Sequence, residues 1–228
     1  AEVAIKEKTD RMSDIEFHMV TLRYDSTLPE IEQVGNVLVH RIGFTRPNPS
    51  MADLRKWPLH LNKYLFQFSA AWKASQLHRR YRYDATWAMM AHSCGVPAAL
   101  FKLFHRSVPF VLELQEGDPP ERYAKHAGPF RGLHHAIFRR ADQVQSISRF
   151  LSDWAVKMGF EGRPVRIPNG VDVSKFAKSE ERRVKDEEIK IISASRLSHK
   201  NGIDLLIRAI TLLPERVWNV PFCPRWYL

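Results

Sequence analysis

Two cations stand between a strand pattern and a helix pattern near the end of the sequence. In "IISASRLSHKNGIDLLIRAI" (residues 191–210), Arg196 and Lys200 occupy the connecting loop. We expect Asn201 to be the helix N-cap and Asp204 to lie in its first turn. The free N–H groups and dipole of a helix N-terminus favour an anion, and guanidinium groups pair with phosphate oxygens. We therefore predict a phosphate or diphosphate subsite at Arg196 and Lys200. Spacing alone, however, favours the alternative of two solvated cations in an ordinary loop.

A second polar group follows the apolar run "PFVLEL". It contains Gln115, Glu116 and Asp118. An amide does not titrate usefully, so Gln115 can only hydrogen-bond a hydroxyl or a carbonyl. Glu116 or Asp118 can accept a proton or bind hydroxyl groups. The alternative for these residues is a polar loop that caps the next helix, and Asp118 before two prolines suits that role.

Asn169 and Gly170 follow the short strand pattern "PVRIP". Both residue types tolerate positive φ, so the pair predicts a turn.

The histidines and cysteines do not predict a metal site. His134 and His135 are adjacent and point in different directions on a helix, and His92 with Cys94 has no partner pair at ligand spacing. The two cysteines suggest no disulfide framework, which indicates a reducing, cytoplasmic context. We expect no metal and no other cofactor.

The formal net charge of +10 is unevenly distributed. Between Arg55 and Arg82 there are seven Lys and Arg and no Asp or Glu. Such a segment attracts phosphates of any kind, including anionic lipids. A core helix with a solvated cationic back is the alternative, in which Phe66, Phe68 and Trp72 fill the face of the sheet. We find no helix-turn-helix or aromatic stacking platform and predict no nucleic-acid partner. The candidates for docking on a membrane are Arg55, Lys56, Lys63, Lys73, Arg79 and Arg80.

Strand and helix patterns alternate along most of the chain. This predicts an α/β, Rossmann-like, mostly parallel sheet with helices on both faces. The expected strands are "IEFHMVTL", "NVLVHRIGF", "DATWAMM", "PFVLELQ", "DQVQSIS", "PVRIP" and "IKIISAS". The expected helices are residues 51–81, "GVPAALFKLF", "ERYAKHAGPFRGLHHAIFRRA", "RFLSDWAVKMG" and "NGIDLLIRAITLL". No run of apolar residues is long enough to cross a bilayer.

A charged segment divides the chain into two predicted domains. Residues 1–177 form the first domain, residues 178–188 form an exposed linker, and residues 189–228 contain the first βα unit of a second domain.

The order of three stretches resembles a known family. "SISRFLSDWAVKMGF", "VRIPNGVDVSKF" and "IISASRLSHKNGIDLLIRAI" are similar to the domain junction of family-4 glycosyltransferases of the GT-B fold. The resemblance implies two Rossmann-like domains facing across a cleft, the first holding the acceptor and the second the nucleotide-sugar donor. It also implies that Arg196 and Lys200 contact the donor diphosphate and that Asn169 and Gly170 lie at the cleft. A histidine often stands where this sequence has Gln115.

The sequence departs from that family in two ways. The family's E-x7-E pair has no counterpart in the right setting, because Glu180 and Glu188 fall in the charged linker, and Glu113 and Glu121 fall in a strand and its following turn. The first strand with its glycine-rich turn is also missing, and the tail after Pro214 leaves the family pattern. We therefore expect a chain that is short at both ends.

The resemblance implies a retaining glycosyltransferase. It would move a sugar from a nucleoside diphosphate sugar to a hydroxyl acceptor, with a lipid-linked acceptor as one option, in polysaccharide or glycolipid synthesis. The expected location is the cytoplasm, with peripheral attachment to the inner face of the plasma membrane as one option. The alternative is a catalytically inactive fragment that acts as a membrane- or partner-binding module.

Overall fold

The computed structural model describes residues 2–117, 131–176, 193, 195 and 201–212 of the chain. The chain forms two compact units, Ala1–Val171 and Asp172–Leu228. The predicted linker at residues 178–188 and the predicted strand "IKIISAS", apart from Ser193 and Ser195, lie outside the described residues.

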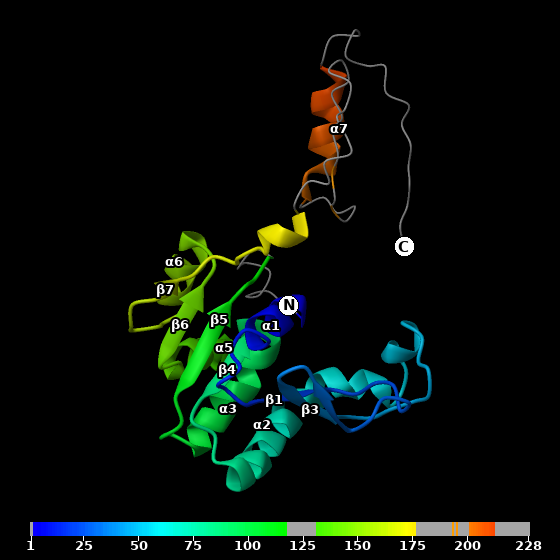
Figure 1. The fold of residues 1–228 in the computed structure, drawn as a ribbon, viewed down its shortest axis with the longest axis vertical. Helices are drawn as coiled ribbons and strands as arrows, with labels where there is room; N and C mark the ends of the chain where they lie inside the picture. The colour runs from blue at the N-terminus through cyan, green and yellow to red at the C-terminus, as the bar shows by residue number, and fades with distance from the viewer. Residues whose placement is uncertain (1, 118–130, 177–192, 194, 196–200, 213–228) are drawn as a thin grey trace. The chain divides into compact units, whose positions relative to one another are not determined.

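The first unit is built around a parallel four-stranded sheet (Figure 1). The strands lie in sequence order, and the register pairs Leu112 with Val144 across the two central strands. All four fall within the segments that the alternating pattern predicts as strands. They are β4 (Thr86–Met89), β5 (Phe110–Leu114), β6 (Gln143–Ser146) and β7 (Val165–Arg166).

Three described helices pack on one face of this sheet and form the main core with it, and the helix α1 (Glu2–Thr9) contacts the other face through Lys8 and Glu113. Phe110, Leu112, Leu114 and Val144 point into that core and are completely buried. The packing is close enough to require a glycine at residue 95, because a Cβ there would come within 2.8 Å of the Ile137 side chain. The helices are α3 (Val96–Phe104), α5 (Arg131–Arg140) and α6 (Arg149–Lys157), and a π-helical turn, η3 (Ala91–Gly95), precedes α3.

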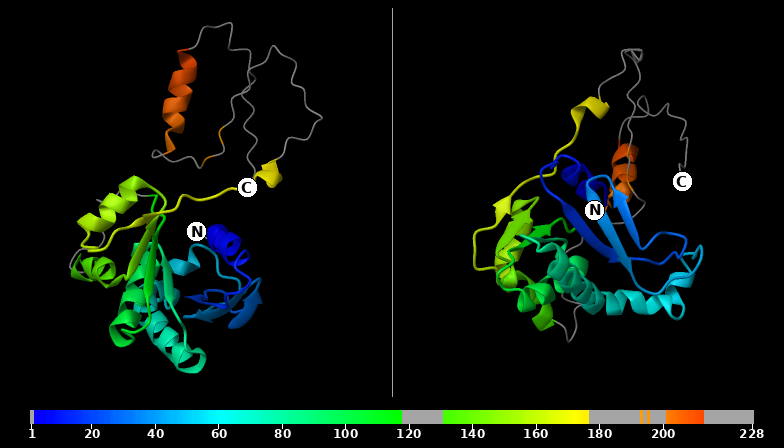
Figure 2. Two further views of the ribbon diagram at one scale, coloured as in Figure 1. Left: turned by 60° about the vertical axis from the view of Figure 1, so that its left-hand side comes forward. Right: turned by 60° about the horizontal axis from the view of Figure 1, so that its bottom comes forward.

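A second, three-stranded sheet contains the strands nearest the N-terminus (Figure 2). β1 (Phe17–Leu22) pairs in parallel with β3 (Val37–Ile42), whereas β2 (Ile31–Val34) pairs antiparallel with β3. The sequence correctly predicts β1 and β3 but not β2. Gly35, with φ of 57°, makes the tight hairpin between β2 and β3 possible.

Asn36 ties the N-terminal helix α1 (Glu2–Thr9) to this hairpin. Its side-chain amide donates to the backbone oxygens of Thr9 (3.2 Å), Met12 (2.7 Å) and Ile15 (2.9 Å). Thr9 is almost completely buried. The carbonyl groups that end α1 and its following turn are thereby satisfied, which fixes where α1 lies relative to β3.

The long helix α2 (Asn62–Tyr81) starts later than its apolar pattern predicts. Residues 51–61 instead contain two short 3-10 turns, η1 (Asp53–Arg55) and η2 (Leu59–Leu61). Pro58 accounts for the difference, because proline lacks an N–H and disfavours helical backbone in the residue before it. The side chain of buried Asn62 exchanges two hydrogen bonds with the backbone of Phe44 and fixes the start of α2.

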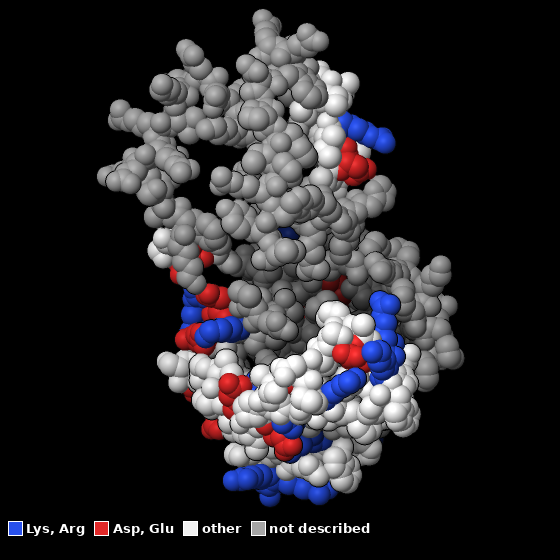
Figure 3. All heavy atoms as spheres, turned by 90° about the vertical axis from the view of Figure 1, so that its right-hand side faces the viewer, with Lys and Arg blue, Asp and Glu red and all other residues white. Residues whose placement is uncertain are grey.

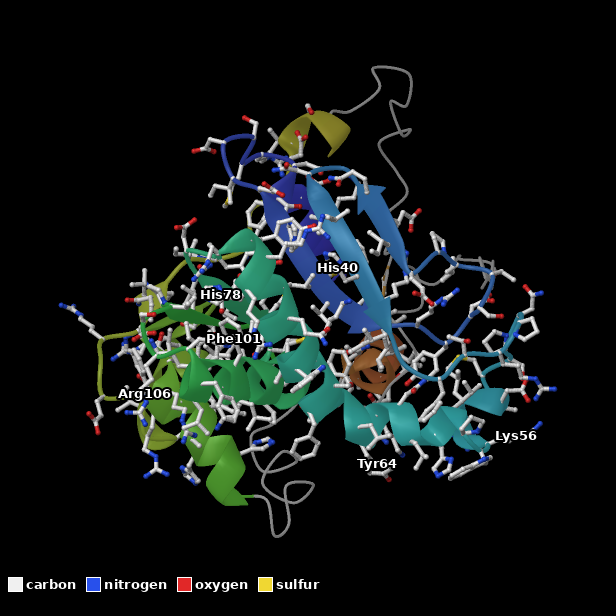
Figure 4. The ribbon with its side chains drawn as sticks, turned by 90° about the horizontal axis from the view of Figure 1, so that it is seen from below. His40, Lys56, Tyr64, His78, Phe101 and Arg106 are labelled. Atoms are coloured by element: carbon white, nitrogen blue, oxygen red, sulfur yellow. The ribbon has the colours of Figure 1, made fainter. Side chains whose placement is uncertain are left out.

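A cluster of His and Tyr side chains, which includes His40 (labelled in Figure 4), joins β1 and β3 to the segment that enters β4. Tyr83 Oη donates to His18 Nδ1 (2.8 Å), and His18 Nε2 lies 2.8 Å from Glu16. Since a carboxylate only accepts, the proton of His18 sits on Nε2. His40, 2% exposed, lies 3.3 Å from His18 Nδ1, and burial lowers the pKa of His40 and raises the pKa of Tyr83.

The described part of the second unit contains two helical segments. A 3-10 turn, η5, spans Val173–Phe176, and α7 spans Ile203–Thr211. Asp204 lies in the first turn of α7 as predicted, but the predicted N-cap is wrong. Gly202, in the left-handed conformation, takes that position in place of Asn201.

Candidate functional site

The candidate site lies at the carboxyl edge of the four-stranded sheet. Because the strands are parallel, the segments that follow them emerge at one edge, where open α/β sheets bind their ligands. Residues 90–95, 115–117, 147–148 and 167–170 form that edge. They include four of the residues singled out from the sequence, which are Gln115, Glu116, Asn169 and Gly170.

Gln115 and Asn169 form a reciprocal amide pair across this edge. The Gln115 Nε2 group donates to Asn169 Oδ1 (3.1 Å), and Asn169 Nδ2 lies 3.4 Å from Gln115 Oε1. The two residues are 54 positions apart in sequence and follow β5 and β7. The predicted turn at Asn169 and Gly170 is wrong, because the segment has no turn and neither residue has a positive φ.

Directly beneath the amide pair lies a buried carboxylate. Glu113, in β5, is 1% exposed and accepts hydrogen bonds from Lys8 Nζ and from Gln115 Nε2 on one oxygen. Its other oxygen accepts from the indole N–H of Trp87 (3.1 Å). The Lys8 ammonium also lies 6.0 Å from the centre of the Trp87 ring. Three donors therefore converge on Glu113, which satisfies a charge that would otherwise be costly to bury.

Glu116 occupies a different environment one residue after Gln115. Its Oε1 accepts the backbone N–H of Ala91 (2.5 Å), at the start of the π-helical turn, and its Oε2 has no hydrogen-bond partner. Glu116 is 7% exposed, and this burial raises the pKa of its carboxyl group despite the backbone hydrogen bonds. Met90, just before the turn, has a φ of 73°, which is rare for a residue with a side chain.

Three of the predicted site residues lie outside the described residues. They are Asp118, Arg196 and Lys200. Their roles at the acceptor and at the donor diphosphate therefore stay predictions. The neighbouring residues Ser195, Asn201 and Asp204 belong to the second unit.

The part of the chain that contains this edge matches a known protein family. The sequence model of the family described as "Glycosyl transferase 4-like domain" matches residues 11–170, which is most of the chain. The chain belongs to this family. The match ends at Gly170, next to the boundary of the first compact unit at Val171. No curated protein matches the chain significantly.

Membership of the family agrees with the predicted α/β, Rossmann-like fold. A glycosyltransferase is the class of protein that both the resemblance and the matched domain indicate. Among the described residues, no cluster of His, Cys, Asp and Glu is arranged to hold a metal ion. No described helix is long and apolar enough to cross a membrane.

The basic segment of this glycosyltransferase domain has an aromatic face that the structure leaves open. Tyr64, Leu65, Phe68 and Trp72 are 61%, 45%, 64% and 65% exposed on α2. Figure 4 shows Tyr64 projecting from the outer side of α2, away from His40. Phe68 and Trp72 therefore do not fill the face of the sheet, as one interpretation of the sequence expected.

The cations of this segment are more dispersed than the sequence suggests. Lys63 lies over the Tyr64 ring at 4.7 Å, whereas Lys56 pairs with Asp53 (2.8 Å). Lys73 lies close enough to His40, in β3, to help lower the pKa of that histidine. On the face in Figure 3, Lys and Arg lie in several separate groups beside Asp or Glu. Arg55, Arg79 and Arg80 are exposed.

Glu113 and Lys8 are the site residues that sequence reasoning did not select. A carboxylate inside the apolar strand "PFVLEL" was a usable signal, because a buried charge requires a partner. Nothing in the sequence identified that partner, which comes from a helix 105 positions earlier.

Proposed function

We propose that this chain takes part in transferring a sugar from a nucleoside diphosphate sugar to a hydroxyl acceptor, with retention of configuration. The first unit binds the acceptor at the carboxyl edge of its sheet. The observation that supports this proposal is the Gln115–Asn169 amide pair. The pair places uncharged hydrogen-bonding groups at that edge of a domain of the glycosyltransferase family. Amides suit hydroxyl groups, because each amide both donates and accepts.

Glu116 is our candidate for the general base that accepts the proton of the acceptor hydroxyl. Its raised pKa makes it a stronger base than an exposed carboxylate, and Oε2 has no partner to compete for the proton. In the transfer, the acceptor oxygen bonds to the anomeric carbon as the bond from that carbon to the diphosphate oxygen breaks. Asp118 is a second candidate, from the sequence.

The negative charge that develops in this reaction is on the departing diphosphate. We assign its stabilisation to Arg196 and Lys200, on the resemblance of their loop to the family's donor loop. The donor supplies the reactive group, and the mechanism requires no metal or other cofactor. The sugar acceptor would be a hydroxyl of a glycan or of a lipid-linked sugar.

The test is a transfer assay with radiolabelled UDP- and GDP-sugars and a panel of sugar acceptors. We expect Arg196→Ala to lower the rate about a hundredfold, as removal of one charge-stabilising donor does in other enzymes. Arg208→Ala, on α7, is the control and should retain activity. Full activity of Arg196→Ala would refute the donor assignment.

The exposed aromatic face favours a second candidate, a module that docks on an anionic membrane. Aromatic side chains suit the membrane interface, and each nearby Lys or Arg adds roughly 1 kcal/mol. Tyr64, Leu65, Phe68 and Trp72 supply the apolar contact, with Lys63 beside them.

Vesicle sedimentation distinguishes this candidate from an enzyme that works in solution. Phosphatidylserine vesicles should bind the chain in a salt-sensitive way, and Phe68→Ser/Trp72→Ser should abolish that binding. The control Val165→Ser changes an exposed apolar residue elsewhere in the first unit. Equal binding by all three proteins would refute docking through α2.

A further inference from the structure

We propose that Glu113 is a positioning residue, whose buried carboxylate sets the orientation of the Gln115–Asn169 amide pair so that the pair recognises two neighbouring hydroxyls of a sugar acceptor. This inference rests on the proposed function. It names the acceptor chemistry for the same site and adds a residue that does not touch the acceptor.

The Glu113 carboxylate determines the direction of the Gln115 amide. A carboxylate offers only acceptor atoms. All the groups around Glu113 are donors, namely the Lys8 ammonium, the Trp87 indole N–H and the Gln115 amide. If Gln115 were rotated by half a turn, its carbonyl oxygen would face a buried carboxylate oxygen. The repulsion between the two oxygens excludes that orientation, so Glu113 fixes Nε2 inward.

The oriented Gln115 amide in turn determines the direction of the Asn169 amide. With Nε2 of Gln115 inward, one of its hydrogens is used by Glu113 and the other by Asn169 Oδ1 (3.1 Å). The Gln115 carbonyl oxygen then faces Asn169 Nδ2 (3.4 Å). Reversing Asn169 alone would oppose two donors and two acceptors. The orientation of Gln115 therefore fixes the orientation of Asn169, which is itself exposed.

The oriented pair keeps donor and acceptor sites that its contacts with the described residues leave open. Each carbonyl oxygen can accept two hydrogen bonds, and each amide nitrogen can donate two. After the contacts above, Gln115 retains one acceptor site, and Asn169 retains one acceptor site and one donor hydrogen. An adjacent donor and acceptor match a pair of neighbouring hydroxyls, of which one accepts and the other donates. Neighbouring hydroxyls of this kind are characteristic of sugars.

Glu113→Gln is the decisive variant because it keeps the shape of the side chain. A glutamine at residue 113 can present either an oxygen or an N–H to Gln115, so the constraint on direction is lost. Asp142→Asn is the matched control, because Asp142 also pairs with a lysine (Lys102, 2.8 Å) and accepts a backbone N–H near the opposite end of β5. Glu113→Asp, which retains the charge but withdraws the carboxylate, replaces Glu113→Gln if that variant does not fold.

The first measurement follows the side-chain amide signals of Gln115 and Asn169 by ¹⁵N NMR of the whole chain without ligand. We expect single signals, with a Gln115 proton displaced to low field by the carboxylate. Glu113→Gln should move or double the signals of both residues, and Asp142→Asn should leave them unchanged. Unchanged signals in Glu113→Gln would overturn the positioning role, whatever the chain's activity.

The second measurement titrates methyl glucoside, a sugar with neighbouring hydroxyls, into the same proteins. Losing a correctly directed hydrogen bond should weaken binding about five- to tenfold in Glu113→Gln. Equal binding after a demonstrated reorientation would overturn the recognition step. If the unaltered chain, with oriented amides, binds no methyl glucoside, then the acceptor site and the proposed function fail, whereas Glu113 still orients the pair.

Discussion

The ion pair between Lys8 and Glu113 makes a prediction about stability that has a control within the same helix. Lys8→Met removes the ammonium group and leaves the Glu113 carboxylate buried, with 1% of its side chain exposed. Removing one partner of a fully buried pair costs about 3–5 kcal/mol. The Lys8 side chain is 26% exposed, and Trp87 and Gln115 still donate to Glu113. Both facts reduce the cost, so we expect Lys8→Met to lower the free energy of unfolding by about 2–3 kcal/mol, which is at or below the lower end of the range for a fully buried pair.

Lys6→Met is the control, because it removes a pair of the same type from the exposed side of α1. Lys6 and Asp10 are 58% and 38% exposed and lie four residues apart, so solvent screens their pair and the pair contributes little to stability. Urea unfolding followed by tryptophan fluorescence and by circular dichroism measures both variants against the unaltered chain. Equal, small losses in the two variants would refute the inference that Lys8 neutralises a buried charge.

Three further variants test other parts of the first unit. The raised pKa of Glu116 means that ionising this residue opposes folding, so Glu116→Gln should become more stable relative to the unaltered chain as pH rises. Urea titrations from pH 4 to 8 measure the difference in the free energy of unfolding, and a difference that does not change with pH would contradict the prediction. Burial lowers the pKa of His40, so stability should fall as pH drops below the ordinary value of 6.5, and His40→Leu should reduce that fall. Gly95→Ala should lower the free energy of unfolding by about 1–3 kcal/mol, because the new Cβ forces the Ile137 side chain aside. Gly132→Ala is the control and should not destabilise the chain, because a Cβ there meets no atom within 4 Å. Similar melting temperatures for the two variants would refute the close packing at Gly95.

The parallel sheet of the first unit could be predicted because its strands are short and alternate with helical patterns. β4 and β5 are mostly apolar, whereas β6 has Val144 as its one apolar residue, and polar turns or Pro109 bound these strands. The β2–β3 hairpin was missed although its signal was present. Gly35 and Asn36 stand between "IEQV" and "VLVHRI", and a glycine–asparagine pair between strand patterns is a hairpin signal. The polar residues Glu32 and Gln33 concealed the strand "IEQV", because an exposed edge strand needs few apolar side chains.

The candidate site could be predicted only in part, for a physical reason. Residues that follow parallel strands share one edge of the sheet, so the positions of Gln115 and Asn169 followed from the order of the elements. The contact between them depends on side-chain rotamers and on the sheet's twist, which no spacing reveals. Glu116 illustrates the difference. Its burial beneath the π-helical turn and the resulting rise in its pKa depend on the backbone at Met90 and Ala91.

The buried pair of Lys8 and Glu113 is not explained by stability alone. Buried ion pairs are often replaced by apolar side chains with no loss, or with a gain, in stability. The double variant Lys8→Met/Glu113→Leu should therefore recover most of the stability that Lys8→Met loses, because no uncompensated charge remains. The same variant should lose the fixed orientation of Gln115, since a leucine does not discriminate between the two ends of an amide. Urea unfolding and the Gln115 side-chain NMR signals separate these effects. If the double variant stays as unstable as Lys8→Met, the ion pair serves the stability of the fold. If the double variant keeps Gln115 oriented, a carboxylate at residue 113 is not needed to orient the amide pair.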